Sequence, residues 1–316
     1  MARANAIYYA THDPFADFTT SPEISQVFGE LIGLWAGLVW QSMGSPSPVR
    51  LIEAGPGRGT MMNDALRAIH RAVPGFAAAL SLHLIETSPR LRPLLQTNLP
   101  GATIHTALQD VPAGPAIFLA NEFLDALPIR QFIRHADGWA ERHVENGRWV
   151  DLPTAIDLPD DPVGTIRERN EGAEAFISTL ANRLADQGGT GLIIDYGPRH
   201  SGPGISLQAL RNGRPADPIT DAGCADLTAH VDFETLASLA TAAGSAVVGP
   251  VSQGIFLTSL GIHERTAQLG RGAQPRDASK LMSATIRLTA PEAMGSLFKA
   301  LALRHPDLPP PPGFIE

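Results

Sequence analysis

The stretch that decides the fold is Leu51-Ile52-Glu53-Ala54-Gly55-Pro56-Gly57-Arg58-Gly59-Thr60, an apolar run that ends in an acid and is followed by three alternating glycines. The pattern predicts a strand over Val49–Ala54, a tight turn, and a helix over Met61–Val73. Glycines let such a turn reach positive φ and let a ligand approach the main chain without meeting a Cβ atom. The start of the helix offers free N–H groups and a partial positive charge beside that ligand.

A second acid follows the next expected strand. The segment Ser81–Glu86 is largely apolar and ends in Glu86. Open α/β sheets bind ligands at the carboxyl ends of their strands, so Glu53 and Glu86 are predicted to face one site. A carboxylate in the second position can accept both ribose hydroxyls of an adenosine. The pair favours a nucleoside cofactor, and the alternative for Glu86 is a solvated charge at a strand end.

Composition limits the classes of function and the compartment. The chain has 316 residues and a net charge of −8, and no run of Lys and Arg is visible, so we expect no nucleic-acid partner. Its single cysteine, Cys224, excludes an internal disulfide, is expected to be buried, and favours a reducing, cytoplasmic location. The longest apolar stretch, Leu31–Trp40, is about half as long as a spanning helix, so no membrane insertion is expected.

Alternating strands and helices predict an α/β fold with a parallel, doubly wound sheet and helices on both faces. Further strands are expected at Thr103–Thr106, Ala116–Ala120, Gly191–Gly197 and, as the last, Ala246–Val251. The alternating segments Pro128–His135 and Trp139–Val144, followed by Asn146-Gly147, predict an antiparallel hairpin insertion. We expect a helix over Ile166–Ala185 and an irregular loop over Arg199–Pro218.

Polar side chains also follow the buried run Ala116–Ala120, namely Asn121, Glu122 and Asp125. They are expected to face the same crevice as the glycine turn, which makes them candidates for chemistry rather than loop caps.

Upstream, Glu23 lies in the first turn of a helix that Thr20 or Ser21 can cap and that continues to Leu38. His230 could accept a proton, although a lone histidine is more often structural. No ligand spacing indicates a metal, so none is expected.

Five stretches, in this order, resemble the MidA family of class I S-adenosylmethionine-dependent methyltransferases. They are Asp17-Phe18-Thr19-Thr20-Ser21-Pro22-Glu23-Ile24-Ser25-Gln26, the glycine turn, Asn121-Glu122-Phe123-Leu124-Asp125-Ala126-Leu127-Pro128, Asp195-Tyr196-Gly197, and Thr228-Ala229-His230-Val231-Asp232-Phe233. The resemblance covers nearly the whole chain. The family includes the mitochondrial factor that dimethylates an arginine of a respiratory complex I subunit.

This resemblance implies a Rossmann-like, seven-stranded sheet with an antiparallel last strand and S-adenosyl-L-methionine at the glycine turn. Residues 1–48 would form an N-terminal helical lid segment. Residues 49–316 would form the methyltransferase domain, with insertions around 128–165 and 198–232. The implied cofactor-binding residues are Glu53, Gly55, Pro56, Gly57 and Gly59 at the turn, Glu86 at the ribose, Asp110 at the adenine, and Asn121 beside the sulfonium.

The resemblance also implies methyl transfer to a protein side chain, with arginine as the expected acceptor and a complex I subunit as a candidate partner. Glu122 and Glu23 would then grip the guanidinium, with Asp125 in support and Asn121 nearby. Two alternatives stay open. The first is an NAD(P)-dependent oxidoreductase, although Thr60 stands where a dinucleotide turn needs glycine or alanine. The second is an assembly factor that binds the cofactor without turnover. An exposed apolar face on the first helix would indicate a homodimer or a lid.

Overall fold

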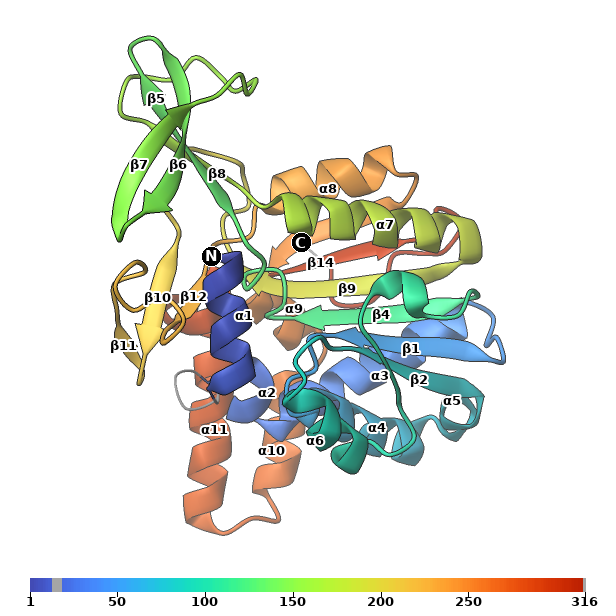
Figure 1. Cartoon of the computed structure of the whole chain (residues 1–316). Coiled ribbons are helices and arrows are strands. Elements are labelled where there is room, and N and C mark those ends of the chain that lie inside the picture. The colour runs from blue at the N-terminus through green and yellow to red at the C-terminus, as the bar shows by residue number, and fades with distance from the viewer. Residues whose placement is uncertain (13–18, 315–316) are drawn as a thin grey trace.

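The computed structural model describes residues 1–12 and 19–314, and the strands of these residues form three separate sheets (Figure 1). The largest has seven strands in the order β13-β14-β9-β4-β1-β2-β3. All its neighbours pair in parallel except β14, which is antiparallel to both β9 and β13. The predicted α/β sheet with one antiparallel strand is therefore confirmed. Its strands are β1 (Val49–Ala54), β2 (Leu80–Ile85), β3 (Thr103–His105), β4 (Ala116–Asn121), β9 (Gly189–Tyr196), β13 (Ala246–Ser252) and β14 (Phe298–Arg304).

The expectation that Ala246–Val251 is the last strand is wrong, because β14 follows it and inserts between β13 and β9. Residues Ala300–Leu303 of β14 are fully buried there. A short apolar run of this kind has no periodicity that separates a buried strand from a buried helix. Pairing on both sides with distant strands decides the outcome, and no local pattern reports that pairing.

Helices cover both faces of the large sheet (Figure 1). The helices α3 (Gln26–Ser42) and α4 (Thr60–Ala72) pack on the face that carries Leu51, whereas α7 (Glu171–Gln187) and α8 (Phe233–Ala242) pack on the face that carries Ile52. Successive strand residues point to opposite faces, which is why β1 serves both cores. The other helices are α1 (Ala2–Thr11), α2 (Ser21–Ile24), α5 (Pro74–Ala79), α6 (Leu91–Asn98), α9 (Gln253–Ser259), α10 (Ile262–Gly270) and α11 (Pro275–Thr289).

The helix expected to run unbroken from Pro22 is divided at Ser25. Ser25 is extended, with φ −155°, and its hydroxyl accepts a hydrogen bond from the backbone N–H of Val27 at the start of α3. Thr20 precedes α2, but its side chain makes no capping hydrogen bond. Pro22 and Glu23 therefore belong to the separate short helix α2. The predicted motif residues Asp17 and Phe18 lie outside the described residues.

The segments predicted as insertions form two smaller sheets. The first, in the order β7-β6-β5-β8, stands away from the large sheet and confirms the predicted hairpin (Figure 1). Its strands are β5 (Arg130–His135), β6 (Gly138–Glu145), β7 (Arg148–Pro153) and β8 (Ile166–Arg169), and those of the second sheet are β10 (Gln208–Arg211), β11 (Arg214–Pro215) and β12 (Asp226–Thr228). The domain limits at 1–48 and 49–316, and the insertion limits at 128–165 and 198–232, stay predictions.

Three further expectations are corrected. Ile166–Arg169 is a strand rather than the start of a helix, because it pairs with β5 and because Asn170 caps α7. The expected irregular loop contains β10 and β11, and Cys224 is exposed rather than buried. In the described part of the chain, no helix has the length and apolar character required to span a bilayer.

Candidate cofactor and substrate site

A cavity of about 710 Å³ opens at the carboxyl ends of β1, β2 and β4. Its walls come from the turns after these strands and from α1 and α2. Most of the residues predicted for the site line it, namely Glu23, Glu53, Gly55, Pro56, Gly57, Glu86, Asn121 and Glu122. Gly59, Asp110 and Asp125 do not line it.

The three glycines of the turn have different surroundings. All are left-handed, with φ +65° at Gly55, +56° at Gly57 and +80° at Gly59. A Cβ atom at Gly55 would lie 2.8 Å from the ring of Phe123, and one at Gly59 would lie 2.9 Å from Leu99 at the end of α6. Gly55 and Gly57 thus form cavity wall, whereas Gly59 caps α4 and permits the close approach of α6.

Glu53 presents a buried and unsatisfied carboxylate oxygen to the cavity. Its side chain is 3% exposed, and Oε2 has no hydrogen-bond partner among the described residues. Burial raises the pKa of this carboxyl to about 8. A buried acid without a partner is costly, so the arrangement suits a ligand that brings a cation or N–H donors to this wall.

Glu86 connects the cavity to α1. Its Oε1 accepts the N–H of Ser88 at 2.7 Å, and the Ser88 hydroxyl donates to the carbonyl of Tyr9 at 3.0 Å. The Tyr9 hydroxyl donates to Asp226 Oδ1 at 2.8 Å. Asn5 Nδ2 donates to two carbonyl oxygens, those of Ala126 and Leu227. The helix α1 is thereby tied to the turns after β2 and β4 and to β12.

Sequence reasoning missed Asn5 and Tyr9, although both line the cavity. Their spacing of one helical turn was the available signal, since residues four apart share a helix face. Asp110, in contrast, is exposed, and its Oδ2 accepts from Thr106 Oγ1 and from the N–H of Ala107, both at 3.1 Å. Its neighbours Leu108 and Gln109 line the cavity instead.

Glu122 stands at a strained turn directly after β4. Its φ is +51°, a left-handed value that is uncommon for a residue other than glycine and that clusters at functional sites. Its Oε1 accepts the N–H of Ser21 at 2.8 Å and Nδ2 of Asn121 at 3.0 Å, which leaves Asn121 Oδ1 buried without a partner among the described residues. Burial raises the pKa of Glu122, against the lowering effect of these hydrogen bonds.

The other two acids predicted for catalysis, Glu23 and Asp125, differ in exposure. Glu23 is exposed at the cavity and its Oε1 accepts the Thr60 hydroxyl at 2.6 Å. Asp125 is buried beneath the cavity and is hydrogen-bonded to Tyr196; burial, and then the charge of Glu122, raise its pKa to about 7. Arg58 of the glycine turn is the only Lys or Arg among the described residues that line the cavity.

His230 lies outside the cavity lining. Its ring is edge-on to Tyr196, and its Nε2 lies 3.3 Å from Gln208 Nε2, which fits the structural reading better than proton transfer. In the described ranges, no group of three or more His, Cys, Asp or Glu side chains could hold a metal ion.

The chain was compared with known proteins. A family described as "Putative S-adenosyl-L-methionine-dependent methyltransferase" matches residues 31–251. The mitochondrial protein arginine methyltransferase NDUFAF7 homologue of Drosophila melanogaster is 34% identical over 96% of this chain and 79% of its own. The mitochondrial protein arginine methyltransferase NDUFAF7 of Homo sapiens is 32% identical over 94% of this chain and 76% of its own.

A solved structure from Burkholderia thailandensis, bound to S-adenosyl-homocysteine, has a TM-score of 0.75 and 25% identity; the match covers 95% of this chain and 80% of that one.

These relatives correct one expectation. The NDUFAF7 proteins are named as mitochondrial, which contradicts the cytoplasmic location inferred from the sequence. The inference was wrong because a single cysteine indicates a reducing environment and does not say which compartment provides it.

Proposed function

Because the chain belongs to the MidA family of S-adenosylmethionine-dependent methyltransferases, we propose that it methylates an arginine side chain of a protein. The observation that carries the proposal is the presence of two carboxylates, Glu23 and Glu122, in the same cavity as the glycine turn. The curated relatives named above are protein arginine methyltransferases, which supports arginine as the acceptor. Membership of the family removes the oxidoreductase alternative.

The cavity fits S-adenosylmethionine in its polar atoms as well as in its glycines. We assign the methionine part to Glu53, Gly55, Pro56 and Gly57, and the ribose to Glu86. The unpartnered oxygens Glu53 Oε2 and Asn121 Oδ1 are acceptors for the donors that this ligand carries. Cofactor contacts from Gly59 and Asp110 stay predictions. When bound, the cofactor supplies a methyl group activated by a sulfonium.

Arginine is a demanding acceptor, because its guanidinium has a pKa above about 12 and no free lone pair. Glu122 and Glu23 would hold two of its nitrogens through charge-assisted hydrogen bonds and localise the positive charge away from the third. Forming the new N–C bond releases one N–H proton. The raised pKa of Glu122 would let this carboxyl, which lines the cavity, receive the proton. Asp125, whose pKa is raised to about 7, does not line the cavity and would support Glu122 from behind.

Two finer proposals accompany this function. Within the predicted lid segment, α1 would cover the cavity, since it bonds to the turns that flank it, whereas α3 packs on the large sheet. A subunit of respiratory complex I, the substrate that the family resemblance implies, would be the protein partner. Assembly into a homodimer stays a prediction from the sequence.

We expect Glu53→Gln to weaken S-adenosylhomocysteine binding about tenfold at about pH 8, because it removes a charged acceptor for the ligand's ammonium group. In the wild type, affinity should rise between about pH 6 and about pH 8 as Glu53 loses its proton, whereas the variant should lack this rise. Calorimetric titration at several pH values measures both, with Glu264→Gln on the exposed side of α10 as the control.

The same substitution should change stability in the absence of ligand. The pKa of Glu53 is raised from 4.5 to about 8 in the folded state, so the protonated carboxyl stabilises the fold fully below pH 4.5. That contribution is lost as the pH rises through about 8. The melting temperature of the wild type should therefore fall relative to that of Glu53→Gln over this range. If the melting temperatures of the two proteins changed in parallel with pH, the pKa of Glu53 would not be raised in the folded state.

The proposed function is tested by methyl transfer. Purified protein and S-adenosylmethionine with a labelled methyl group are added to an extract of source cells that lack the protein, and labelled proteins are hydrolysed to amino acids. We expect label in methylarginine. Label in methyllysine or another residue would overturn the choice of acceptor. No transfer, with binding of S-adenosylhomocysteine retained, would favour the assembly factor without turnover.

A further inference from the structure

We propose that Asp195 is a positioning residue for methyl transfer, whose carboxylate fixes the turn after β4 in the conformation that directs Glu122 to the cavity. The inference rests on the role assigned above to Glu122. Asp195 ends β9 beside β4, and the sequence marked it only as an acid at a strand end and as part of a family motif.

The carboxylate of Asp195 accepts hydrogen bonds from the free N–H groups of this turn. Its Oδ2 accepts from the backbone N–H of Phe123 at 3.2 Å, of Leu124 at 2.9 Å and of Asp125 at 3.3 Å. Its Oδ1 accepts from the N–H of Tyr196 at 2.9 Å. The side chain is fully buried, so its partners are these backbone groups rather than water.

These donors are free because Glu122 takes the chain out of the sheet. The N–H of Glu122 still donates to the carbonyl of Ile194 at 2.9 Å, as the last bond of the ladder. After the left-handed φ of Glu122, the next N–H groups donate to the side chain of Asp195 rather than to the backbone carbonyls of β9. A strained residue keeps such a conformation only when its surroundings determine it. Asp195 provides that constraint, because unpaired N–H groups in this buried segment would be costly.

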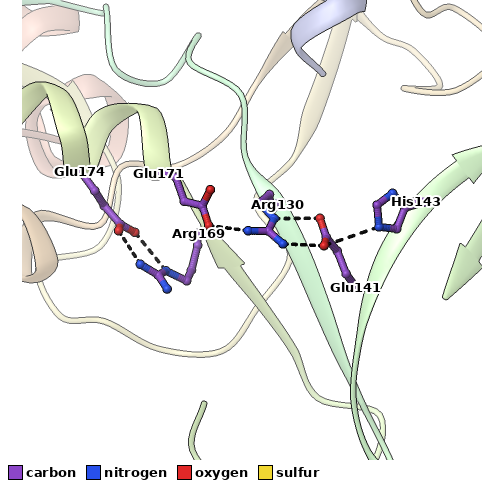
Figure 2. A network of polar contacts seen from close by, with 6 residues as sticks. All are labelled: Arg130, Glu141, His143, Arg169, Glu171 and Glu174. Carbon is purple, nitrogen blue, oxygen red and sulfur yellow. Dashed lines mark hydrogen bonds and ion pairs between the residues drawn. The ribbon is translucent and has the colours of Figure 1, made fainter. Parts of the chain in front are cut away.

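The carbonyl side of the same turn is held by Asn170. Its Nδ2 donates to the carbonyls of Leu124 at 3.0 Å and Leu127 at 3.2 Å, while its Oδ1 accepts the N–H of Ala173 and caps α7. The two residues that flank Asn170 in the sequence, Arg169 and Glu171, are held by the ion pairs drawn in Figure 2. Arg169 pairs with Glu174 at 2.5 Å, and Glu171 pairs with Arg130, which also binds Glu141. The N–H groups of the turn are therefore held by Asp195 and its carbonyl groups by Asn170.

An amide could not replace this carboxylate. One oxygen of Asp195 receives three N–H donors and the other receives a fourth. In Asp195→Asn one of these positions would carry an NH₂ group that faces another donor. If the amide oxygen faced the turn, the NH₂ group would face the N–H of Tyr196; in the other orientation the three turn N–H groups would lose their acceptor. Both orientations remove at least one hydrogen bond and the negative charge that strengthens the others, while the volume of the side chain stays almost unchanged. The substitution therefore tests position rather than packing.

Asp195 does not line the cavity, and most of the proposed cofactor contacts follow β1 and β2, while Asn121 on β4 precedes the turn that Asp195 holds. Asp195→Asn should therefore lower kcat about a hundredfold through misplacement of Glu122, and leave the Kd for S-adenosylhomocysteine within a factor of about two. Hydrogen exchange at the amides of residues 123–125 should become faster. Asp307→Asn removes an exposed acid that follows β14, at the edge of the sheet where β9 begins and away from the cavity, and should change none of these quantities.

A double-mutant cycle separates positioning from general damage to the fold. Glu122→Gln should cost much less activity in the Asp195→Asn background than in the wild type, because the misplaced carboxylate has already lost its effect. Equal costs in the two backgrounds would overturn the proposal. So would unchanged exchange at residues 123–125 in a folded Asp195→Asn protein.

A second variant covers the case in which Asp195→Asn does not fold. Asn170→Asp keeps the capping oxygen of α7 but removes both donors to the turn, and should give the same loss of kcat with S-adenosylhomocysteine binding retained. Retained kcat in this variant would overturn the proposal. If the wild type transfers no methyl group, the proposed function fails, while hydrogen exchange in these variants still decides whether the turn is held as described.

Discussion

Substitution of Gly57 by valine is expected to abolish cofactor binding, with an increase of at least about a hundredfold in the Kd for S-adenosylhomocysteine. Gly57 has φ +56°, a conformation that a β-branched residue adopts only under strain. Gly57 also lines the cavity, so a valine there would add bulk to the wall against which the ligand must fit. Both effects oppose binding and neither can be relieved by a side-chain rotation.

Calorimetric titration of wild type and Gly57→Val measures this loss, with NADH as a control ligand. Gly101→Val is the matched control, because a Cβ atom at Gly101 meets nothing within 4 Å and φ there is not left-handed. A melting curve confirms that each variant is folded. Unchanged affinity in folded Gly57→Val would place the cofactor away from the glycine turn and contradict the assignment of Glu53 as well.

The parts of the site that the sequence predicted are those encoded by short segments. A strand, an acid and alternating glycines lie within ten residues, so the positions of Glu53, Gly55 and Gly57 follow from local pattern alone. The carboxyl ends of parallel strands then bring Glu86, Asn121 and Glu122 to the same edge of the sheet. The resemblance supplied the number of strands in the large sheet and the antiparallel direction of the last one.

The parts that the sequence did not reveal depend on contacts between distant segments. Asn5 bonds to Leu227, and Asp195 bonds to the turn after Glu122; neither partner can be found by periodicity. Two residues that the resemblance assigns to the cofactor have structural roles that the sequence did not reveal. Asp110 caps its own turn, and Gly59 permits the packing of α4 against α6, while their contacts with the ligand stay predictions.

Glu122→Gln is expected to lower kcat for arginine methylation by about a thousandfold, with binding of S-adenosylhomocysteine nearly unchanged. The glutamine oxygen can still accept from Ser21 and Asn121, so the turn should keep its shape. What is lost is the charge that would localise the guanidinium cation and the carboxyl that would receive its proton. Glu23→Gln should cost less, because Glu23 is exposed and its charge is screened by solvent.

The measurement is the rate of label transfer to the identified arginine substrate, at saturating S-adenosylmethionine, for wild type and for the two variants, with Glu264→Gln as the control. Full activity in Glu122→Gln would show that neither its charge nor its proton affinity contributes to the reaction. If Glu23→Gln lowered the rate more than Glu122→Gln, the main hydrogen-bond acceptor for the guanidinium would instead be Glu23 on α2. The strained turn at Glu122 would then serve mainly to present Asn121 and Phe123, which line the same cavity.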